Sequence, residues 1–460
     1  MSSSRPETLR RALVLAGTPT ESYLSDGVRT IPLREALETS RLGGTRDSLA
    51  GRSVLLAVDT QFEAALALIE LDGLARRIVL LPPDVKSQQL PAIVRDAEID
   101  AIVCTAPEAF EALGPETVVF QVDVAVPVMP PDTSLATEWL MLTSGTTGDP
   151  KLAIHTLGGL TGAIPLLPDA VSRPRWATFY DIRRYGGLQI FLRAMFCGGN
   201  LVLSRPGEPV ADHLERLSQA DVTHVSGTPS HWRRVMMTKA AIGFNPSYVR
   251  LSGEIADQPI LDGLRAAFPA ASIGHAYAST EAGVGFDVND GLEGFPASYL
   301  DAPRNGVEMR IQDGCLQIRS GRMASAYAGR PDLPLVGADG WVDTGDMVEV
   351  IDGRCHFRGR RSGVINVGGL KVHPEEIETV INRHAAVRQA KVKPRKSPII
   401  GNIVVADVVL ADGTHDADQV KRNIIELCAA SLPTHKVPAL VNIVSSIEMT
   451  AGGKVSRQHA

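Results

Sequence analysis

Ser53–Leu81 reads SVLLAVDTQFEAALALIELDGLARRIVLL and predicts a strand, a helix and a second strand in succession. Ser53–Asp59 and Ile78–Leu81 are short apolar runs of the kind found in buried strands. The segment between them, Phe62–Arg76, has the length and the amphipathic character of a helix. Two strands joined by a helix pair in parallel, so this stretch predicts an α/β fold.

The same alternation of strand and helix continues to residue 276. Further strands are expected at Trp176–Tyr180, Leu201–Ser204, Thr223–Ser226 and Tyr248–Ser252. This spacing predicts mainly parallel sheets that are covered by helices. Such sheets bind ligands at the carboxyl ends of their strands, where the loops begin.

The pattern changes after Gly306, where strand-like runs such as Val307–Ile311 are separated by Gly and Asp turns and predict a small β-rich part. A helix start at Pro374, followed by apolar residues at helical spacing, indicates a return to α+β character. We therefore expect a large N-terminal domain over residues 1–361. A small α+β C-terminal domain is expected over residues 362–460.

The overall composition favours a globular protein that acts on small molecules. The chain has 460 residues, of which 44% are hydrophobic and 21% are charged. Its formal net charge of −6 argues against nucleic acid as a partner, because such binding needs a basic surface. Five scattered cysteines without a CxxC spacing argue against a disulfide framework or a zinc site. No apolar run reaches the length of a membrane span and no signal-peptide core is found, so we expect a cytoplasmic protein.

The strongest local motif is a polar, glycine-containing loop that follows the strand-like run Trp139–Leu142. The loop consists of Thr143, Ser144, Gly145, Thr146, Thr147, Gly148, Asp149, Pro150 and Lys151. Its glycines let backbone N–H groups approach a polyphosphate, its hydroxyls add donors, and Lys151 adds a cation. A polar surface turn is the simplest alternative. A Walker loop is excluded because its lysine follows Gly and precedes Ser or Thr, whereas Lys151 lies between Pro150 and Leu152.

The loop resembles the phosphate loop of the AMP-forming acyl-adenylate superfamily, which includes acyl-CoA synthetases, the adenylation domains of peptide synthetases and firefly luciferase. Four further motifs of that family follow in its order, so the resemblance spans Thr143 to Arg457 and is closest to acyl-CoA synthetases. It implies that a small carboxylic acid is activated with ATP as acyl-AMP, that pyrophosphate is released, and that the acyl group is transferred to CoA. It also implies that the N-terminal domain, residues 1–361, binds the nucleotide and the acid. The cofactors it implies are ATP, Mg²⁺ and CoA.

The second motif, Ala276–Glu281, is similar to the family's Tyr-Gly-x-Thr-Glu segment. The resemblance implies that Tyr277 stacks on adenine, that Thr280 contacts the α-phosphate, and that Glu281 binds Mg²⁺, which prefers carboxylate and phosphate oxygens. On its own, a Thr-Glu pair would indicate a helix start. Three other positions are expected to contact the nucleotide as well: Gly253, Glu254 and His275.

The third motif, Trp341–Asp346, is similar to the family's Thr-Gly-Asp segment. The resemblance implies that Asp346 binds the ribose hydroxyls, which suits a carboxylate acceptor. Arg360 follows at the family's distance and is expected to contact the ribose too. A hairpin turn is the alternative for an isolated Gly-Asp pair.

The fourth motif, Arg361–Val372, resembles the family's hinge, about which the C-terminal domain swings between adenylation and thiol transfer. The resemblance therefore implies that residues 362–460 form a mobile lid, with Ser362 at the hinge position. Gly368 and Gly369 would let a pantetheine arm pass close to the backbone. A glycine-rich β-turn is the alternative.

The fifth motif, Thr450–Arg457, is similar to the segment that carries the family's mobile catalytic lysine. Lys454 is expected to bridge the substrate carboxylate and the α-phosphate. Together with Thr280 and Glu281, it forms the expected catalytic group. Because adenylation brings anions together, cations carry much of the catalysis.

The sequence leaves the acid and the acceptor open. The acid pocket is expected to include Trp176–Phe191, where Arg183, Arg184 and Tyr185 either bind a second anionic group or form an exposed pair of arginines beside a tyrosine. CoA is the preferred acceptor, and a separate carrier protein or an amine is the alternative. A nucleotide-binding protein without catalysis is a hypothesis of another class. It rests on three departures from the family pattern: Ala278, Ser362 and Asn366.

Overall fold

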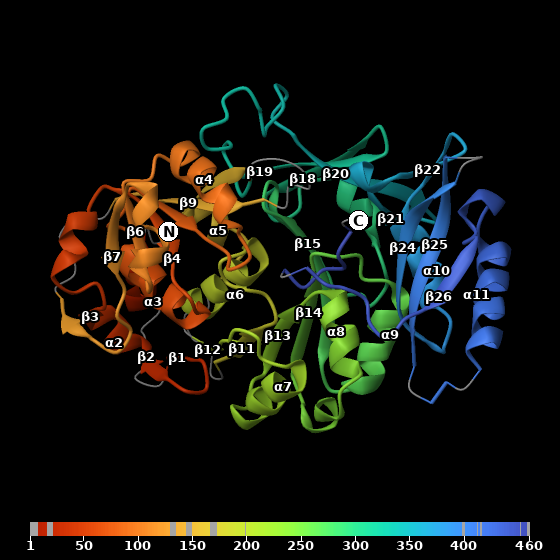
Figure 1. Ribbon diagram of the computed structural model, residues 1–460, viewed down its shortest axis with the longest axis horizontal. Helices are drawn as coiled ribbons and strands as arrows, with labels where there is room; N and C mark the ends of the chain where they lie inside the picture. The colour runs from red at the N-terminus through yellow and green to blue at the C-terminus, as the bar shows by residue number, and fades with distance from the viewer. Residues whose placement is uncertain are drawn as a thin grey trace.

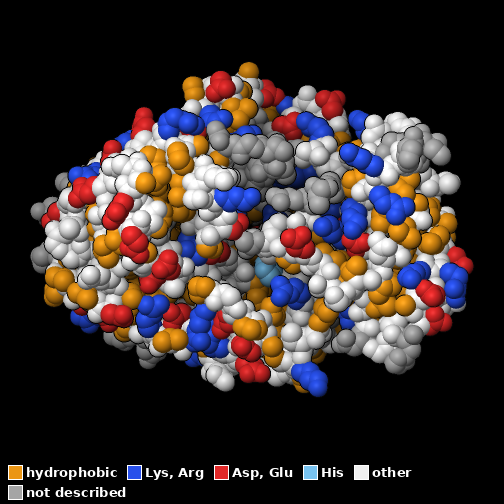
Figure 2. Space-filling model, viewed as in Figure 1, with side chains coloured by type: hydrophobic (Ala, Val, Ile, Leu, Met, Phe, Trp, Pro, Cys, Tyr) orange, Lys and Arg blue, Asp and Glu red, His pale blue; other side chains and the backbone are white. Residues whose placement is uncertain are grey.

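The structure is a computed structural model that describes residues 8–15, 22–128, 135–143, 150–165, 173–197, 199–397, 401–411, 413–414, 416–450 and 452–457. In Figure 1 the chain runs from one sheet on the left, through a second in the centre, to an α+β unit on the right. Charged side chains of both signs are interspersed with apolar ones on the face shown in Figure 2. None of the helices in the described residues is long and apolar enough to cross a membrane.

The first sheet has six strands in the order β10-β9-β5-β4-β6-β7. Its strands are β4 (Ser53–Ala57), β5 (Arg77–Leu80), β6 (Ala101–Cys104), β7 (Glu116–Val119), β9 (Glu138–Leu142) and β10 (Leu152–Thr156). All neighbours are parallel except β9 and β10, which are antiparallel. The predicted strand–helix–strand unit is confirmed as β4, α3 (Gln61–Leu71) and β5, and β9 is the predicted strand before the phosphate loop.

Helix α3 shows why this region forms as predicted. Thr60 caps its first turn, because its side chain accepts from the Glu63 amide while the Glu63 side chain accepts from the Thr60 amide. The helix ends at Leu71 rather than at the predicted Arg76, because Gly73 adopts a φ of +86° that an α-helix does not allow.

The second sheet has eight strands in the order β16-β15-β14-β13-β11-β12-β1-β2. Its strands are β1 (Tyr23–Ser25), β2 (Thr30–Pro32), β11 (Arg175–Thr178), β12 (Asn200–Val202), β13 (His224–Gly227), β14 (Tyr248–Ser252), β15 (Ser272–Ser279) and β16 (Gly283–Val288). The six central strands are parallel, and β2 and β16 pair antiparallel at the two edges. All four strands predicted here are confirmed, with ends shifted by a residue or two.

Helices cover both faces of the second sheet. Buried residues of α3 and α6 (Tyr185–Phe196) share one apolar core with strands of both sheets. The opposite face packs against α7 (Val210–Gln219), α8 (Pro229–Met236) and α9 (Gln258–Ala267). Trp176 and Ala177 belong to the two different cores, because successive side chains of a strand point to opposite faces. The remaining helices before residue 290 are α1 (Leu9–Leu15), α2 (Leu33–Glu38), α4 (Leu90–Asp96) and α5 (Leu157–Thr161).

The predicted β-rich part is an antiparallel sheet in the order β17-β21-β20-β19-β18. It consists of β17 (Phe295–Pro296), β18 (Val307–Gln312), β19 (Cys315–Ser320), β20 (Val342–Ile351) and β21 (Arg354–Arg360). A short pair, β3 (Thr39–Ser40) and β8 (Val126–Pro127), lies apart from the large sheets. The carboxyl end of β21 leads directly into the C-terminal part of the chain.

The C-terminal part has its own apolar core. Its elements are β22 (Ile365–Val367), β23 (Leu370–Val372), α10 (Pro374–Asn382), β24 (Val387–Ser397), β25 (Gly401–Leu410), α11 (Ala417–Ser431) and β26 (Leu440–Ile443). Strands β22 and β23 form a hairpin, and β24, β25 and β26 form a small sheet. The predicted α+β character is confirmed, and α10 begins at the predicted Pro374.

Candidate active site

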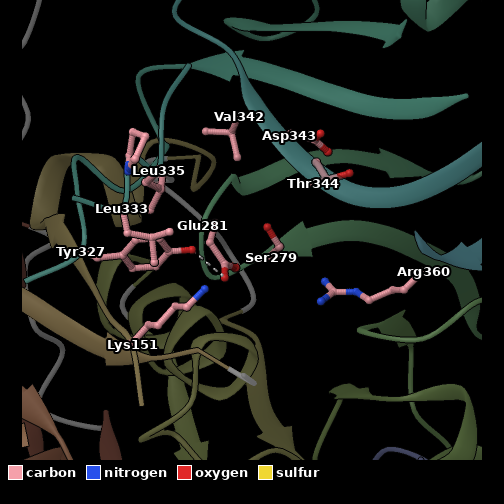
Figure 3. A pocket seen from close by; sticks show the side chains of 11 residues that line it. Lys151, Ser279, Glu281, Tyr327, Leu333, Leu335, Val342, Asp343, Thr344 and Arg360 are labelled. Atoms are coloured by element: carbon pink, nitrogen blue, oxygen red, sulfur yellow. Dashed lines mark hydrogen bonds between the residues drawn. The ribbon is translucent and has the colours of Figure 1, made fainter. Parts of the chain in front are cut away.

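A cavity of about 230 Å³ lies at the carboxyl end of β15, facing the antiparallel sheet (Figure 3). Three residues singled out from the sequence line it, Lys151, Glu281 and Arg360. The other lining residues are Ser279, Tyr327, Leu333, Pro334, Leu335, Val342, Asp343, Thr344. The fold thus brings together segments that are far apart in the chain, at the strand ends where the sequence predicted ligands to bind.

Tyr327 contacts both Lys151 and Glu281 in the cavity. The ammonium of Lys151 lies 5.4 Å from the centre of the Tyr327 ring. The Tyr327 hydroxyl donates a hydrogen bond of 3.3 Å to Glu281 Oε1, as Figure 3 shows. Burial, and then the nearby Glu281 carboxylate, raise the pKa of Tyr327, so its hydroxyl stays a donor.

The phosphate loop is described only at its two ends. The amide of Thr143 donates to the carbonyl of Lys151 over 3.0 Å, which holds the ends together where β9 and β10 pair. Five residues predicted to bind the nucleotide lie outside the described residues: Ser144, Gly145, Thr146, Thr147 and Gly148.

Thr280 and Glu281 lie in the turn between β15 and β16, not at the start of a helix. The carbonyl of Thr280 accepts a hydrogen bond of 2.7 Å from the Nε2 of His155, a residue of β10. The side chain of Glu281 points into the cavity beside Ser279, the last residue of β15 (Figure 3).

Asp346 is held on both of its carboxylate oxygens. The Tyr277 hydroxyl donates to Oδ2 over 2.6 Å, and the Arg360 Nε donates to Oδ1 over 3.2 Å. Arg360 and Asp346 are direct partners in the ladder between β21 and β20, which sets this geometry. A carboxylate oxygen has further lone pairs, so Asp346 can accept ribose hydroxyls in addition.

The ring of Tyr277 is one of three nearly parallel aromatic rings. Its centre lies 5.6 Å from that of Phe286 and 5.3 Å from that of Phe357, with interplanar angles of 16° and 8°. Burial, and then the charge of Asp346, raise the pKa of Tyr277, which keeps its hydroxyl protonated. His275, two residues earlier on β15, presents Nε2 to the carbonyl of Leu292 at 3.0 Å.

The segment that carries Lys454 docks on the N-terminal part of the chain. The amide of Val455 donates to Glu254 Oε1 over 2.8 Å, while the Ser230 amide donates to Glu254 Oε2 over 3.0 Å. The hydroxyl of Thr228 donates to the carbonyl of Gly453 over 2.6 Å. Glu254 therefore bridges backbone groups of two chain segments, a role that the sequence did not predict for it.

Lys454 lies over Gly253. A Cβ at Gly253 would lie 3.2 Å from Lys454 Cε and 3.7 Å from Nζ, so the absence of a side chain there leaves room for the lysine. The side chain keeps solvent contact within the cleft. Loss of hydration lowers the pKa of Lys454, and the carboxylate of Glu254 opposes that shift. Arg360 and Asp346 are near enough for their charges to act on Lys454 as well.

The donor set at Glu281 fits a hard divalent cation that is bound mainly by a substrate. Among the described residues, no group of three or more His, Cys, Asp or Glu side chains could hold a metal by itself. A single carboxylate beside the space for a polyphosphate is the arrangement that Mg²⁺ uses with nucleotides.

The interpretation of Arg183 and Arg184 as an exposed pair is wrong. Arg183 is only 3% exposed, and its guanidinium donates to both carboxylate oxygens of Asp181 and to the carbonyl of Val58. It is therefore bound within the protein and is not available to a second anionic group of a substrate. Arg184 forms an ion pair with Asp84 and lies next to Gly452, beside the Lys454 segment. Tyr185 is buried.

The remaining predicted residues lie away from the cavity. Gly368 and Gly369 form the turn of the β22–β23 hairpin, with φ values of +57° and +89°. The Gly369 amide donates to the Asn366 side chain over 2.9 Å. Ser362 lies in the single helical turn Arg361–Gly363 that follows β21.

Four residues that contact the predicted site were missed in the sequence: His155, Thr228, Tyr327, and His231, whose imidazole lies against Gly453. None of them belongs to a recognisable motif. His155 could have been noticed as a polar residue at an inward position of a strand with apolar neighbours.

Two family models match the chain. One, described as AMP-binding enzyme, matches residues 50–317, and the other, described as the AMP-binding enzyme C-terminal domain, matches residues 376–454. The first covers more than half of the sequence, and the chain belongs to the family of AMP-binding enzymes.

The chain is similar in sequence to several ligases. The chain is 28% identical over 429 residues to the 2-succinylbenzoate–CoA ligase of Salmonella typhimurium, a match covering 89% of this chain and 86% of the relative. It is 27% identical over 452 residues to the p-hydroxybenzoic acid–AMP ligase FadD22 of Mycobacterium marinum, a match covering 91% of this chain and 63% of the relative. By their names, these two relatives join a carboxylic acid to CoA and to AMP, respectively.

Solved structures show the same fold. The anthranilate CoA ligase AuaEII in complex with anthranoyl-AMP superposes with a TM-score of 0.80, at 18% identity over 97% of this chain and 95% of that one. The amide bond synthetase McbA from Marinactinospora thermotolerans superposes with a TM-score of 0.79, at 19% identity over 97% of both chains.

Proposed function

We propose that this site joins a small carboxylic acid to AMP and then passes the acyl group to the thiol of CoA. The observation that supports this proposal is that Lys151, Glu281 and Arg360 line one cavity, while Lys454 is docked near enough for the charge of Arg360 to act on it. Cations from three distant segments face a space in which a carboxylate and a triphosphate would otherwise repel each other.

In the first half-reaction a carboxylate oxygen of the acid attacks the α-phosphorus of ATP, and the bond to the bridging oxygen of pyrophosphate breaks. We assign Lys151 to the departing phosphates and Lys454 to the charge that develops on the α-phosphate. Thr280 is assigned to a contact with the same phosphate. Glu281 would hold Mg²⁺, which offsets the charge of the phosphates when it is bound.

We assign Asp346 and Arg360 to the ribose and Tyr277 to the adenine. The hydrogen bonds to the two oxygens of Asp346 support its assignment, because they fix the carboxylate in one orientation. His275 and Gly253 are assigned to the edge of the nucleotide site. Glu254 is assigned to holding the Lys454 segment rather than to the nucleotide, because backbone amides occupy its oxygens.

In the second half-reaction the thiolate of CoA attacks the acyl carbon, and AMP leaves. We propose that residues 362–460 act as a mobile lid that exposes the Gly368–Gly369 turn to pantetheine in this step. The separate core of the C-terminal part supports a unit that moves as a body. A cytoplasmic location, where ATP and CoA are supplied, fits five cysteines that are free thiols.

ATP–pyrophosphate exchange over a panel of aryl, alkyl and dicarboxylic acids tests the first half-reaction. We expect exchange with at least one acid, and no exchange without acid. The same acid is then offered with CoA, with a carrier protein that bears a free phosphopantetheine thiol, and with simple amines. Thioester formation with CoA is the expected result, whereas amide formation alone would reassign the acceptor.

A further inference from the structure

His155 is a buried residue of β10 that contacts the turn carrying Thr280 and Glu281. It is 1% exposed, and its Nε2 lies 2.7 Å from the carbonyl oxygen of Thr280. A carbonyl only accepts hydrogen bonds, so Nε2 carries the proton in this contact. Burial lowers the pKa of His155 to about 4, against the opposing effect of the Thr280 bond, so the ring is neutral near pH 7. Nδ1 of His155 has no hydrogen-bond partner among the described residues, so the ring is held by the bond from Nε2 to Thr280.

A second connection reaches the same turn from residues 324–327. The Ala324 amide donates to the carbonyl of Glu281 over 2.9 Å. The next residues exchange two backbone hydrogen bonds with Ile154 of β10, Ser325 over 2.9 Å and Ala326 over 3.0 Å. Tyr327 then turns its hydroxyl to the Glu281 carboxylate. Glu281 is thereby linked to β10 through its backbone and through its side chain.

Strand β10 begins immediately after Lys151. The position of Lys151 relative to Glu281 is therefore fixed by two routes, one through His155 and Thr280 and the other through residues 324–327. The second route ends within the cavity shown in Figure 3, where Tyr327 contacts both Lys151 and Glu281.

We propose that His155 and Tyr327 are positioning residues that hold Thr280 and Glu281 at a fixed distance from Lys151, so that MgATP is bound in the reactive geometry. The inference rests on the proposed function of the site, since it assigns Glu281 to the metal. It predicts that the two residues affect Mg²⁺-dependent nucleotide binding, whereas a structural role alone predicts only a loss of stability.

The His155 route is tested with His155→Leu and His155→Gln. Leu removes the donor, and Gln can place an amide N–H near the position of Nε2. ATP binding is measured by calorimetry with Mg²⁺ and with EDTA, together with the Mg²⁺ half-saturation of pyrophosphate exchange and the melting temperature.

For His155→Leu we expect the affinity for ATP to fall about 10-fold in the presence of Mg²⁺ and by less in the presence of EDTA. The reason is that Glu281 would contact ATP only through the Mg²⁺ ion, so its displacement matters only when the ion is bound. His155→Gln should recover most of the difference. Equal losses in Mg²⁺ and EDTA, or a Gln variant as impaired as the Leu variant, would overturn the proposal. The binding measurement needs no acid, so it stands even if no acid in the panel supports exchange.

The Tyr327 route keeps the proposal testable if His155→Leu fails to fold. Tyr327→Phe removes the 3.3 Å bond to Glu281, and Tyr299→Phe is the matched control, because it removes a 3.3 Å bond to the carbonyl of Asp287 outside the cavity. We expect Tyr327→Phe to raise the Mg²⁺ half-saturation about 3- to 10-fold and Tyr299→Phe to leave it unchanged. The same change in Mg²⁺ half-saturation in both variants, or no change in either, would contradict a positioning role for Tyr327.

Discussion

Gly453 lies directly against the imidazole of His231: a Cβ added to Gly453 would lie 1.7 Å from Cε1 and 2.0 Å from Nε2 of that ring. His231 cannot easily yield, because it stacks on Phe179 with ring centres 5.5 Å apart and caps α8 together with Thr228. The Gly453 carbonyl accepts from Thr228 in the same place. This contact fixes the backbone of the residue before Lys454.

Gly453→Ala should therefore unseat the Lys454 segment and slow adenylation by roughly 10²-fold, on the scale of a misplaced catalytic group. Acyl transfer from a supplied acyl-AMP should change little. Pyrophosphate exchange and single-turnover thioester formation separate the two effects.

The double variant Gly453→Ala/His231→Ala provides the critical comparison. Removing the ring makes room for the new methyl group, so adenylation should recover relative to Gly453→Ala alone. Gly207→Ala is the control for backbone strain, because Gly207 has a φ of +68° and a Cβ added there would have no described heavy atom within 4 Å apart from its chain neighbours. Additive effects of the two substitutions would show that the ring contact does not matter.

Lys454→Ala should reduce adenylation by roughly 10²–10³, as expected for the loss of one positioned donor to a developing charge. ATP binding should largely survive, since Lys151 and the ribose contacts are retained. Lys421→Ala, an exposed lysine paired with Asp418 on α11, is the control and should have no effect. An unchanged exchange rate in Lys454→Ala would remove this residue from the chemistry.

The sequence predicted local structure well and long-range contacts poorly, for physical reasons. The strand–helix–strand unit at Ser53–Leu81 follows from local periodicity, and all three elements are present, although the helix ends at Leu71 instead of Arg76. The packing of Lys454 on Gly253 joins residues that no periodicity relates. Tyr327 acts through one hydroxyl and belongs to no motif. The sequence left Arg183 either as a ligand for a second anion or as part of an exposed pair, because its contact with the distant carbonyl of Val58 arises only in the folded chain.

Glu375 should make stability depend on pH. Its side chain is 15% exposed, and its carboxylate lies against Gly359 and 3.3 Å from the Nε of Arg457. Burial raises the pKa of Glu375 to about 7, although Arg457 opposes the shift. The folded protein then keeps a proton that the unfolded chain releases near pH 4.5, so the stability contribution falls as pH rises from there to about 7.

Glu375→Gln removes this titration. Relative to the wild type, the variant should gain roughly 1–3 kcal/mol between pH 5 and pH 8. Urea denaturation at the two pH values measures the difference. The same change with pH in both proteins would mean that Arg457 keeps Glu375 ionised throughout.

Gly369→Leu should block thiol transfer and spare adenylation, if the Gly368–Gly369 turn lines the path of pantetheine in the second half-reaction. In the present arrangement this turn is exposed, and among the described residues no heavy atom beyond its chain neighbours lies within 4 Å of a Cβ at Gly369, so a larger side chain there meets no steric obstacle from them during adenylation. A leucine at a φ of +89° also strains the backbone. Gly353→Leu is the control for this strain, because Gly353 has a φ of +76° in another exposed turn and a Cβ there would meet no described heavy atom within 4 Å apart from its chain neighbours. Pyrophosphate exchange and thioester formation are measured for both variants. Equal slowing of both half-reactions in Gly369→Leu, or the same loss in Gly353→Leu, would place the pantetheine path elsewhere.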